Sequence, residues 1–281
     1  VEEDLRILAK HWDYLRLYDS SRHAEIVLEV IDRAGLDFTV MLGLDFGAEV
    51  SNPDCPWGAD FTAETLAANR RSNDEQVVRA IELANRYQEI VFSVAVGNEA
   101  AVDWTDHMVP VDRLTSQARK VKQSVEQLVT SCDNYVPWTD KLAPLAAELD
   151  FVSVHTYPVW EYRTVEDALE YSQQNYHAVA SRYPDKPVVI TEAGWTTASN
   201  GRGIDPSNAS EEIQAQYYEE LEAWTQREQI LTFVFEAFDE PWKGSPDPLE
   251  PEKHWGLFRL DRTPKLVMQT LYAELLSDRA S

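Results

Sequence analysis

The sequence is poor in cysteine and has no long apolar run. Its 2 cysteines, Cys55 and Cys132, are too few for a disulfide framework, and we expect two free, buried thiols in separate loops. No apolar run approaches the roughly 18 residues that a transmembrane helix requires. The opening residues, Val1 to Asp4, do not have the character of a signal peptide, so a targeting segment is expected only upstream of this sequence.

Positive charge is scarce as well. Lys and Arg number 25 against 49 Asp and Glu, which gives a formal net charge of −24. Such a surface repels nucleic acids and anionic membranes, so we expect neither as a partner, whereas a neutral ligand is compatible with it. The 6 histidines include no His-x-His or His-x-x-x-His pair, and no Gly-rich loop leads into a helix with a lysine. We therefore expect no metal, no phosphate-binding loop and no other cofactor.

The chain alternates between strand-like and helix-like segments, which indicates an α/β protein. Seven apolar or β-branched runs are expected to form strands, at residues 14–18, 38–42, 90–96, 129–134, 151–154, 188–190 and 230–235. The run at 129–134 could instead close the preceding helix, and we favour the strand. Helices are expected at residues 21–34, 74–88, 112–128, 165–182, 213–224 and 265–276. The polar loop at 43–73 is longer than packing requires, and we expect it to shape a cleft.

These segments and the length of 281 residues predict one catalytic domain over residues 1–281, a (β/α)8 TIM barrel. The seven strands would be the second to the eighth, because the segment Glu2–His11 has the pattern of the helix that follows the first strand. A barrel without its first strand would leave two edges open to water. We therefore expect that the first strand is missing because this sequence begins late, and that the complete fold has eight strands.

Two of the expected strands lead directly to a glutamate. Glu99 follows the run at 90–96, and Glu192 follows the run at 188–190. A carboxylate at the end of a buried strand loses hydration and must be compensated, and the carboxyl ends of barrel strands share the face where active sites lie. Two carboxylates about 5–5.5 Å apart are what a retaining glycosidase uses as nucleophile and as acid/base. The alternative is that both glutamates form structural ion pairs.

Other polar and aromatic side chains follow the same strand ends, and we expect them to bind a neutral sugar. Aromatic faces would stack on the sugar rings, and carboxylates would accept hydrogen bonds from hydroxyl groups. These residues are Tyr18, Asp19, Asn98, Asp133, Asn134, Tyr157, Trp195, Glu236, Glu240 and Trp242. Asn98 is expected to reach the sugar 2-hydroxyl. The alternatives are a rim role for Tyr18 and Asp19, a plug at the top of the barrel for Trp195, and rim packing for Trp242. For Asp133 and Asn134 the alternative is loop capping, and for Glu236 it is a salt bridge to Arg16 or Lys243.

Six segments together resemble the signatures of glycoside hydrolase family 17, a clan A barrel family of β-1,3-glucanases, in its bacterial and fungal branch. They are Arg16–Asp19, Val96–Glu99, His155–Pro158, Ile190–Trp195, Phe235–Lys243 and Glu252–Phe258. The resemblance implies that Glu99 is the acid/base and Glu192 the nucleophile. It also places Glu240, Lys243 and Glu252 at auxiliary acidic and basic positions, and Tyr157 beside the nucleophile. The family's first strand has no counterpart in this sequence.

Three functions follow as hypotheses. The first is a retaining endo-β-1,3-glucanase that hydrolyses laminarin-like glucan, and the second is a β-1,3-glucanosyltransferase that passes the sugar to another glucan. The third is a glucan-binding protein without catalysis, which the intact Asn98, Glu99 and Glu192 disfavour. We expect a monomer whose partner is a β-1,3-glucan polysaccharide or oligosaccharide. A polymeric substrate implies a secreted, periplasmic or cell-surface location.

Overall fold

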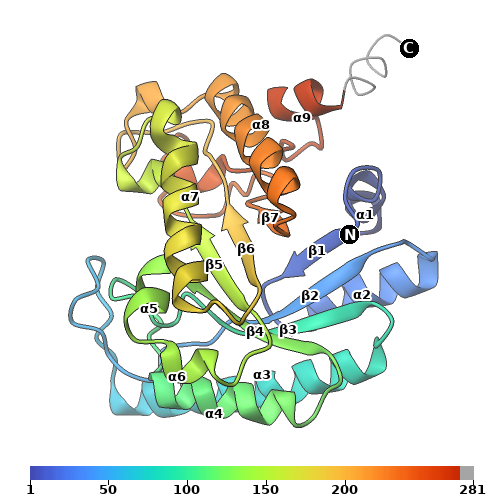
Figure 1. The fold of residues 1–281 in the computed structure, drawn as a ribbon, viewed down its shortest axis with the longest axis vertical. Coiled ribbons are helices and arrows are strands. Elements are labelled where there is room, and N and C mark those ends of the chain that lie inside the picture. The colour runs from blue at the N-terminus through green and yellow to red at the C-terminus, as the bar shows by residue number, and fades with distance from the viewer. Residues whose placement is uncertain (273–281) are drawn as a thin grey trace. The chain divides into compact units, whose positions relative to one another are not determined.

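The computed structural model describes residues 1–272, which contain seven strands (Figure 1). The contacts divide the chain into two compact units. Unit 1 comprises Val1–His155 and Ala178–Val189, and unit 2 comprises Thr156–His177 and the chain from Ile190 onward. The predicted α/β class and the predicted number of strands in this part of the chain are confirmed.

Unit 1 is built on parallel strands that follow one another in chain order. The strands are β1 (Tyr14–Leu17), β2 (Thr39–Leu44), β3 (Val91–Asn98), β4 (Leu128–Asn134) and β5 (Val152–Thr156, whose last residue belongs to unit 2). Each strand from β1 to β4 pairs in parallel with the next. β3 and β5 are buried along almost their whole length, as is typical of parallel strands with both faces covered.

Helices of unit 1 connect and cover these strands. They are α1 (Glu2–Leu8), α2 (Arg22–Ala34), α3 (Ala63–Arg86), α4 (Val111–Lys122), α5 (Tyr135–Asp140) and α6 (Ala143–Ala146). α3 and α4 lie side by side and pack against β2, β3 and β4 (Figure 1). α2 agrees with the sequence pattern, because Ser21 caps its first turn and Gly35 ends it in the left-handed conformation at φ 60°.

The sequence prediction was wrong about the start of α3. This helix begins at Ala63, after the N-cap Thr62, and not at residue 74, so part of the predicted 43–73 loop is helical. The early turns are mostly exposed and polar, so they carry no apolar stripe that would indicate a helix. The next helix, α4, ends at Lys122, before the predicted 128. Residue 128 is not helical, because strand β4 begins at Leu128.

Two other predictions in unit 1 are confirmed. The segment at 129–134 forms strand β4, and the Asn134 side chain then caps α5 by accepting a hydrogen bond from the Val136 N–H at 3.0 Å. Cys55 and Cys132 are free and buried. The predicted loop position is correct for Cys55, which follows β2, and wrong for Cys132, which lies in β4.

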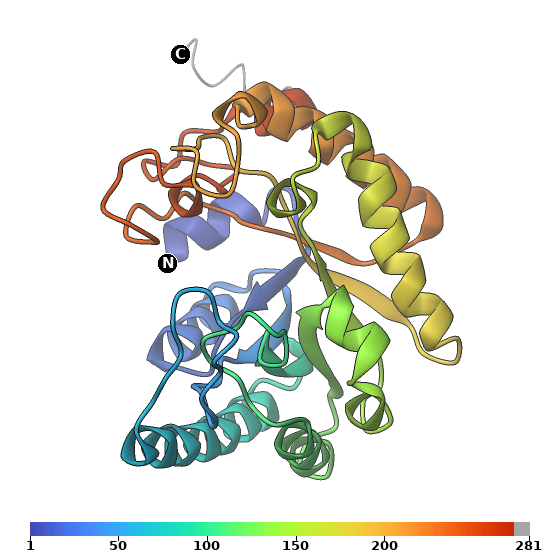
Figure 2. The same cartoon turned by 90° about the vertical axis from the view of Figure 1, so that its left-hand side faces the viewer.

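Unit 2 contains two parallel strands and the helices around them. The elements are β6 (Val188–Ala193, which begins in unit 1), β7 (Thr232–Val234), α7 (Val165–Arg182, which ends in unit 1), α8 (Glu211–Glu228), α9 (Leu266–Leu271) and the 3-10 turns η1 (Pro158–Glu161), η2 (Pro206–Asn208) and η3 (Pro251–Lys253). α8 buries Tyr217, Leu221 and Trp224 and lies beside α9 (Figure 2). Of the predicted final helix, residues 273–276 lie outside the described residues.

Membrane-spanning helices are not found in the described part of the chain. No helix within residues 1–272 is long and apolar enough to cross a bilayer.

Candidate active site

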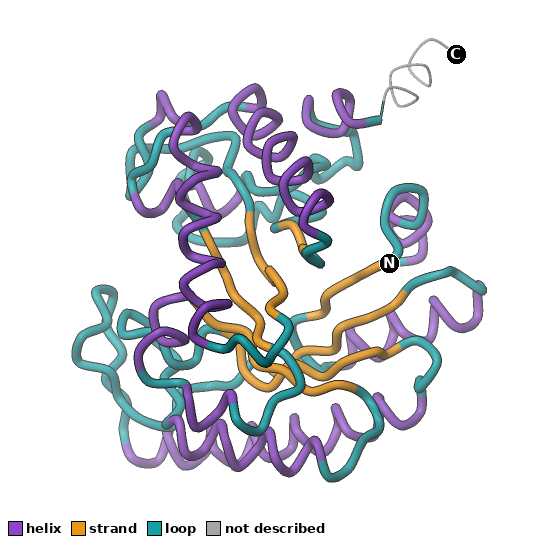
Figure 3. The backbone as a smooth tube through the Cα atoms, viewed as in Figure 1, coloured by secondary structure: helices purple, strands orange, loops and turns teal. Residues whose placement is uncertain are grey.

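Most of the predicted site residues lie at or just beyond the carboxyl ends of strands, whereas Glu240, Trp242 and Lys243 lie farther along the loop after β7 and Glu252 lies in η3. Figure 3 shows the strands and the loops that follow them. Unit 1 carries Tyr18, Asp19, Asn98, Glu99, Asp133 and Asn134, and unit 2 carries Tyr157, Glu192, Trp195, Glu236, Glu240, Trp242, Lys243 and Glu252. Parallel strands of one unit end at the same edge, so the residues at the strand ends of a unit share that edge. The separation of Glu99 and Glu192, which belong to different units, stays a prediction.

A sharp backbone turn ends β3 and presents Glu99. Gly97 has φ 88° and Glu99 itself has φ 46°, so two residues close together adopt a left-handed conformation. A Cβ at position 97 would lie 3.1 Å from the Leu114 side chain, which leaves little room for any residue but glycine. The Glu99 N–H donates to the Cys132 carbonyl at 2.9 Å and so fixes the turn to β4.

The Glu99 carboxyl is held by a histidine from β5. His155 Nδ1 lies 2.9 Å from Glu99 Oε1, and the His155 side chain is fully buried. The side chain of Glu99 is 30% exposed, so the carboxyl is fixed on one side and open to solvent on the other. This is suitable for a group that must exchange a proton with a ligand. The buried His155 therefore orients Glu99.

Asn98 is fixed by two residues that the sequence did not single out as site residues. Its Oδ1 accepts a hydrogen bond from Arg16 Nη2 at 2.5 Å, and its carbonyl oxygen lies 2.9 Å from His107 Nε2. The Arg16 guanidinium also lies over the ring of Tyr18, 4.3 Å from its centroid. Arg16 belongs to the segment Arg16–Asp19 that resembles a family signature, but nothing in the sequence indicated its contact with Asn98. The loop around His107 has no periodicity that could reveal this residue.

The charge state of His107 depends on opposing influences. Burial lowers its pKa, but the hydrogen bond with Asp106, the Asn98 carbonyl and the negative charge of Asp45 outweigh burial, and the net pKa is raised. His107 Nδ1 lies 2.8 Å from Asp106 Oδ1 and 3.1 Å from the Thr105 hydroxyl. Both ring nitrogens therefore have partners, and the imidazole ties the loop after β3 to the backbone of Asn98.

Asp19, Asp133 and Asn134 make structural contacts. Asp19 Oδ1 accepts from the Ser21 N–H at 2.9 Å at the start of α2. Asp133 is buried and accepts from the N–H groups of Ala101 and Asn134 at 3.0 and 2.8 Å. Burial, reinforced by the nearby Glu99 charge, raises the pKa of Asp133 to about 8, against the effects of His155 and the two backbone donors. These contacts favour loop capping over sugar binding for the three residues.

In unit 2, Glu192 is held by a phenol. The Tyr157 hydroxyl donates to Glu192 Oε2 at 2.5 Å, and Glu192 is 6% exposed. The Tyr157 ring is itself fixed by edge-to-face contacts with Phe235 and Trp255, at centroid distances of 5.8 and 5.3 Å. A short hydrogen bond from a fixed donor orients the carboxylate and compensates part of its lost hydration.

Lys243 joins two acidic residues of unit 2. Its Nζ lies 2.8 Å from Glu236 Oε2 and 2.5 Å from Glu240 Oε2, so the predicted alternative of a Glu236–Lys243 salt bridge is confirmed. Burial raises the pKa of Glu236 to about 8, although Lys243 lowers it. Burial likewise raises the pKa of Glu252, again against Lys243. The group combines a cation with acidic side chains that can hold protons near neutral pH.

The two tryptophans predicted for unit 2 differ in exposure. Trp195 is fully buried, and its Nε1–H donates to the Asn208 carbonyl at 2.8 Å, so its ring faces are covered by protein. The Trp195 ring contacts Tyr217 at a centroid distance of 5.2 Å. These contacts favour a packing role over sugar stacking for Trp195. By contrast, Trp242 is 70% exposed and has a face available for a sugar ring.

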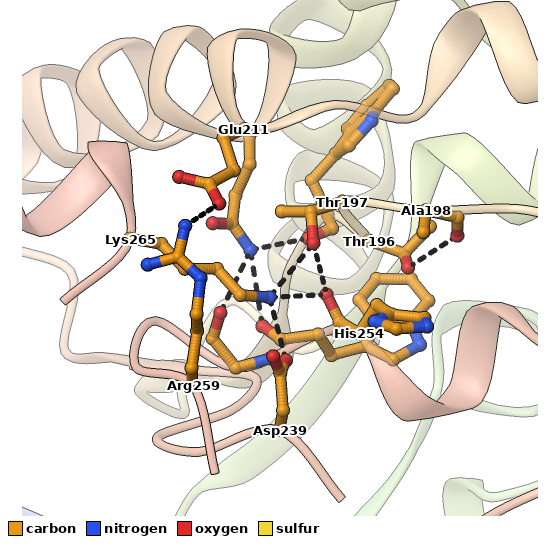
Figure 4. Close-up of polar contacts among 12 residues, drawn as sticks. Thr196, Thr197, Ala198, Glu211, Asp239, His254, Arg259 and Lys265 are labelled. Atoms are coloured by element: carbon orange, nitrogen blue, oxygen red, sulfur yellow. Dashed lines mark hydrogen bonds and ion pairs between the residues drawn. The ribbon is translucent and has the colours of Figure 1, made fainter. Parts of the chain in front are cut away.

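A cavity of about 620 Å³ lies elsewhere in unit 2, beside the buried Lys265. Lys265 Nζ contacts Asp239 Oδ1 at 2.7 Å, the Thr197 hydroxyl at 2.9 Å and the His254 carbonyl at 3.0 Å (Figure 4). Burial lowers the pKa of Lys265, and the ion pair with Asp239 opposes this. The other charged pair shown, Arg259 with Glu211, is likewise matched. The polar groups at this cavity therefore serve to hold α8, α9 and the neighbouring loops together.

Comparisons with known proteins agree with a carbohydrate-active barrel. A family model described as the BtgE/BtgC glycoside hydrolase domain matches residues 1–256. A glucan 1,3-beta-glucosidase of Arthroderma benhamiae is 25% identical over 195 residues, which cover 63% of this chain and 61% of that protein. The chain thus spans less than two thirds of the length of this relative.

Two solved structures have the same fold. An endo-laminarinase from Formosa matches with a TM-score of 0.84 and 27% sequence identity, covering 97% of this chain and 81% of that one. A glycoside hydrolase family 17 β-1,3-glucanosyltransferase from Rhizomucor miehei matches with a TM-score of 0.72 and 23% identity, covering 95% and 89%. The predicted fold class, a (β/α)8 TIM barrel, is confirmed by these matches.

Proposed function

The chain belongs to the BtgE/BtgC glycoside hydrolase family, and from that premise we propose that it is a retaining endo-β-1,3-glucanase acting on laminarin-like glucan. The observation that carries the proposal is the pair of strand-end glutamates, each held by its own hydrogen-bonding partner. Glu99 contacts His155, and Glu192 accepts from Tyr157. The endo-laminarinase from Formosa, at 27% identity, supports the choice of substrate and of endo cleavage.

In the first step, Glu192 acts as the nucleophile. Its carboxylate attacks the anomeric carbon, the bond from that carbon to the leaving oxygen breaks, and Glu99 gives its proton to this oxygen. The hydrogen bond from Tyr157 holds Glu192 Oε2 and so sets the direction of the carboxylate. When His155 donates from Nδ1 to Glu99 Oε1, the acidic proton of Glu99 resides on Oε2.

In the second step, Glu99 acts as a base. It removes a proton from water, the water oxygen attacks the anomeric carbon, and the Glu192 carboxylate is released. Asn98 is positioned by Arg16 and His107 next to Glu99, and we assign it the sugar 2-hydroxyl, where hydrogen bonds strengthen in the transition state. The exposed Trp242 provides a stacking face, and the Lys243 cluster supplies hydrogen-bond partners for sugar hydroxyls.

The test is a time course of products from linear β-1,3-glucose oligomers. We expect short products with retained configuration from the wild type, and kcat lower by about 10³-fold or more for Glu192→Gln and Glu99→Gln. Glu89→Gln is the matched control, because Glu89 is exposed and lies just before the other end of β3. Products of inverted configuration would contradict the double displacement.

Azide can separate the two carboxylate roles. Added to Glu192→Ala, azide takes the place of the nucleophile and should give a glycosyl azide of inverted configuration. Added to Glu99→Ala, it should attack the glycosyl-enzyme and give a glycosyl azide of retained configuration. The reverse pattern would exchange the two assignments.

A β-1,3-glucanosyltransferase is the second candidate, supported by the fold shared with the Rhizomucor miehei enzyme. Transfer uses the same covalent intermediate but gives it to a sugar hydroxyl instead of water. Products longer than the substrate in the time course would favour it. Binding of glucan without any turnover by the wild type would instead favour a non-catalytic glucan-binding protein.

The remaining expectations are also proposals. We propose a secreted, periplasmic or cell-surface location, because a glucan polymer does not cross a membrane intact. We further propose that the protein acts as a monomer, which light scattering at several protein concentrations would test.

A further inference from the structure

Trp57 is an exposed indole in a part of the chain that the mechanism does not use. All nine tryptophans lie within the described residues, and only Trp57 and Trp242 among them are exposed, at 60% and 70%. Tryptophan is highly buried on average, and a large exposed apolar face often marks a binding site. Trp57 belongs to unit 1 and lies in the loop between β2 and α3.

The loop that carries Trp57 is attached to the loop that follows Glu99. The N–H groups of Glu49 and Val50 both donate to the Met108 carbonyl, at 2.9 and 3.3 Å. The buried Asn52 side chain donates from Nδ2 to the carbonyls of Asp103 and Thr105, both at 2.7 Å. Figure 2 shows the two loops side by side. β2 and β3 are parallel neighbours, so both loops leave the same edge of the sheet.

The tip of this loop is folded, so the backbone that carries the exposed indole is fixed. The Asn52 N–H donates to the Ala59 carbonyl at 2.9 Å, and the Gly58 N–H donates to the Cys55 carbonyl at 3.1 Å. Cys55 and Ala59 are buried, whereas the residues flanking the indole, Pro56 and Gly58, are exposed. A rigid aromatic side chain that is already in place loses little conformational entropy when a ligand stacks on it.

The chemistry around Trp57 fits a neutral sugar. The exposed carboxylates of Asp54 and Asp60 belong to the same loop, and the half-buried Trp104 lies in the adjoining loop between the two carbonyls that bind Asn52. A pyranose has an apolar C–H face that packs on an indole and hydroxyl groups that donate to carboxylates. An acidic surface disfavours nucleic acid and other polyanions at this place.

We propose that Trp57 is a stacking platform for a glucosyl residue several units away from the bond that is cleaved. This inference rests on the proposed β-1,3-glucanase function and adds that the loops at 49–61 and 100–109 form a remote subsite of the same cleft. A chain long enough to reach Trp57 gains an additional contact, whereas a short oligomer does not. Trp57 therefore sets the preference of the enzyme for longer glucans.

The test is the dependence of kcat/KM on chain length, measured with β-1,3-glucose oligomers of increasing length for the wild type and Trp57→Ala. For the long oligomers, Trp57→Ala should lower kcat/KM about tenfold, equivalent to ~1.4 kcal/mol. The shortest oligomer that the wild type cleaves should be unaffected. Trp57→Tyr keeps an aromatic face and should retain most of the activity on long chains. Leu128→Ala, a change of an exposed apolar residue at the opposite end of the strands, is the matched control.

The outcomes separate this proposal from the function on which it rests. If the wild type cleaves β-1,3-glucan and Trp57→Ala keeps the full gain with chain length, the platform is refuted and the function stands. An equal loss on short and long oligomers would indicate a structural role for Trp57 and would also overturn the platform. If the wild type cleaves no β-1,3-glucan of any length, the proposed function itself fails.

Discussion

Asp133 is the most deeply buried of the carboxyl groups at the strand ends of unit 1, and its surroundings make it sensitive to pH. It is 1% exposed, and burial raises its pKa to about 8, well above the roughly 3.9 of an aspartate in an unfolded chain. In the folded protein it therefore keeps its proton over a pH range in which the unfolded chain has lost it. The stability that this difference provides is fully present below about pH 4 and is lost as the pH rises towards 8.

Asp133→Asn should remove this component. The quantity of interest is the free energy of unfolding of the wild type minus that of the variant. We expect this difference to fall steadily between about pH 4 and pH 8 and to stay level above pH 8. Urea unfolding at a series of pH values measures the difference. Asp37→Asn, at an exposed aspartate, is the control and should follow the wild type. Parallel curves for the wild type and Asp133→Asn would show that Asp133 titrates alike in both states.

The two proposed catalytic residues could be predicted from the sequence, and so could Tyr157 beside Glu192, whereas the contacts that fix Asn98 could not. A carboxylate directly after a buried apolar run is visible in the sequence, which identified Glu99 and Glu192. Arg16 lies inside a strand, where alternation reveals only its face, and His107 lies in a loop without periodicity. Their contacts with Asn98 depend on how strands and loops distant in sequence come together. The sequence likewise did not reveal that Trp195 is covered by protein.

At the scale of elements, β1 and β2 approach so closely that one position between them requires glycine. A Cβ at Gly43 would lie 2.3 Å from the Tyr18 carbonyl oxygen and 2.4 Å from that of Leu17. Both contacts are with backbone, which cannot move without separating the strands. Gly47, in the loop that follows β2, is less restricted, because a Cβ there would meet only the Asn69 side chain, at 3.2 Å.

Gly43→Ala should therefore destabilise unit 1 more than Gly47→Ala does. We expect the first change to lower the free energy of unfolding by about 2 kcal/mol or more, and the second by less than about 1 kcal/mol. Urea unfolding monitored by circular dichroism measures both. Equal losses for the two variants would contradict the close approach of β1 and β2.

Elements with a strong apolar pattern could be predicted, and those without one could not. The stripe of α2 and the buried runs of β3 and β5 determine these elements through their own side chains. The early turns of α3 are mostly exposed and carry no apolar stripe, and only the Thr62 cap, which accepts a hydrogen bond from the Thr65 N–H, marks their start. A single cap residue is common in loops as well, so it did not outweigh the missing apolar stripe.

At the scale of the whole molecule, the net charge of −24 opposes compactness. Exposed ion pairs such as Arg22–Glu25 and Arg86–Glu25 contribute little to stability, and salt weakens them. Salt also screens the repulsion among the excess carboxylates, which involves many more pairs of charges. We therefore expect the screening of repulsion to dominate.

Sodium chloride should raise the melting temperature of the protein between about 0.02 and 0.3 M, with most of the rise at the low end of this range. Over the same range kcat/KM for a neutral glucan should change less than about twofold, since the substrate carries no charge to be screened. Thermal unfolding followed by fluorescence measures the first effect, with sucrose at equal osmolality as the control for a non-ionic solute. A melting temperature that falls with salt would mean that the ion pairs dominate.

The alternation of strands and helices was sufficient to predict the barrel class, because each segment carries its own period and length. The division of the chain into two compact units depends on contacts between distant segments, such as those of β6 with β7 and of α8 with α9. No local pattern in the sequence encodes these contacts. The fold class was therefore accessible from the sequence, and the grouping of its elements was not.

The loop that carries Trp57 is attached to the loop after β3 mainly through backbone groups, with Asn52 as the one side chain that takes part. Its four hydrogen bonds to the loop after β3 come from the backbone N–H groups of Glu49 and Val50 and, twice, from the side chain of Asn52, and the tip contributes none of them. Residues 53–58 can thus be exchanged in evolution while the Asn98–Glu99 turn keeps its geometry. Selection for a different glucan length or branching would act on this tip as a separate module, and related enzymes would diverge here before they diverge at the catalytic carboxylates.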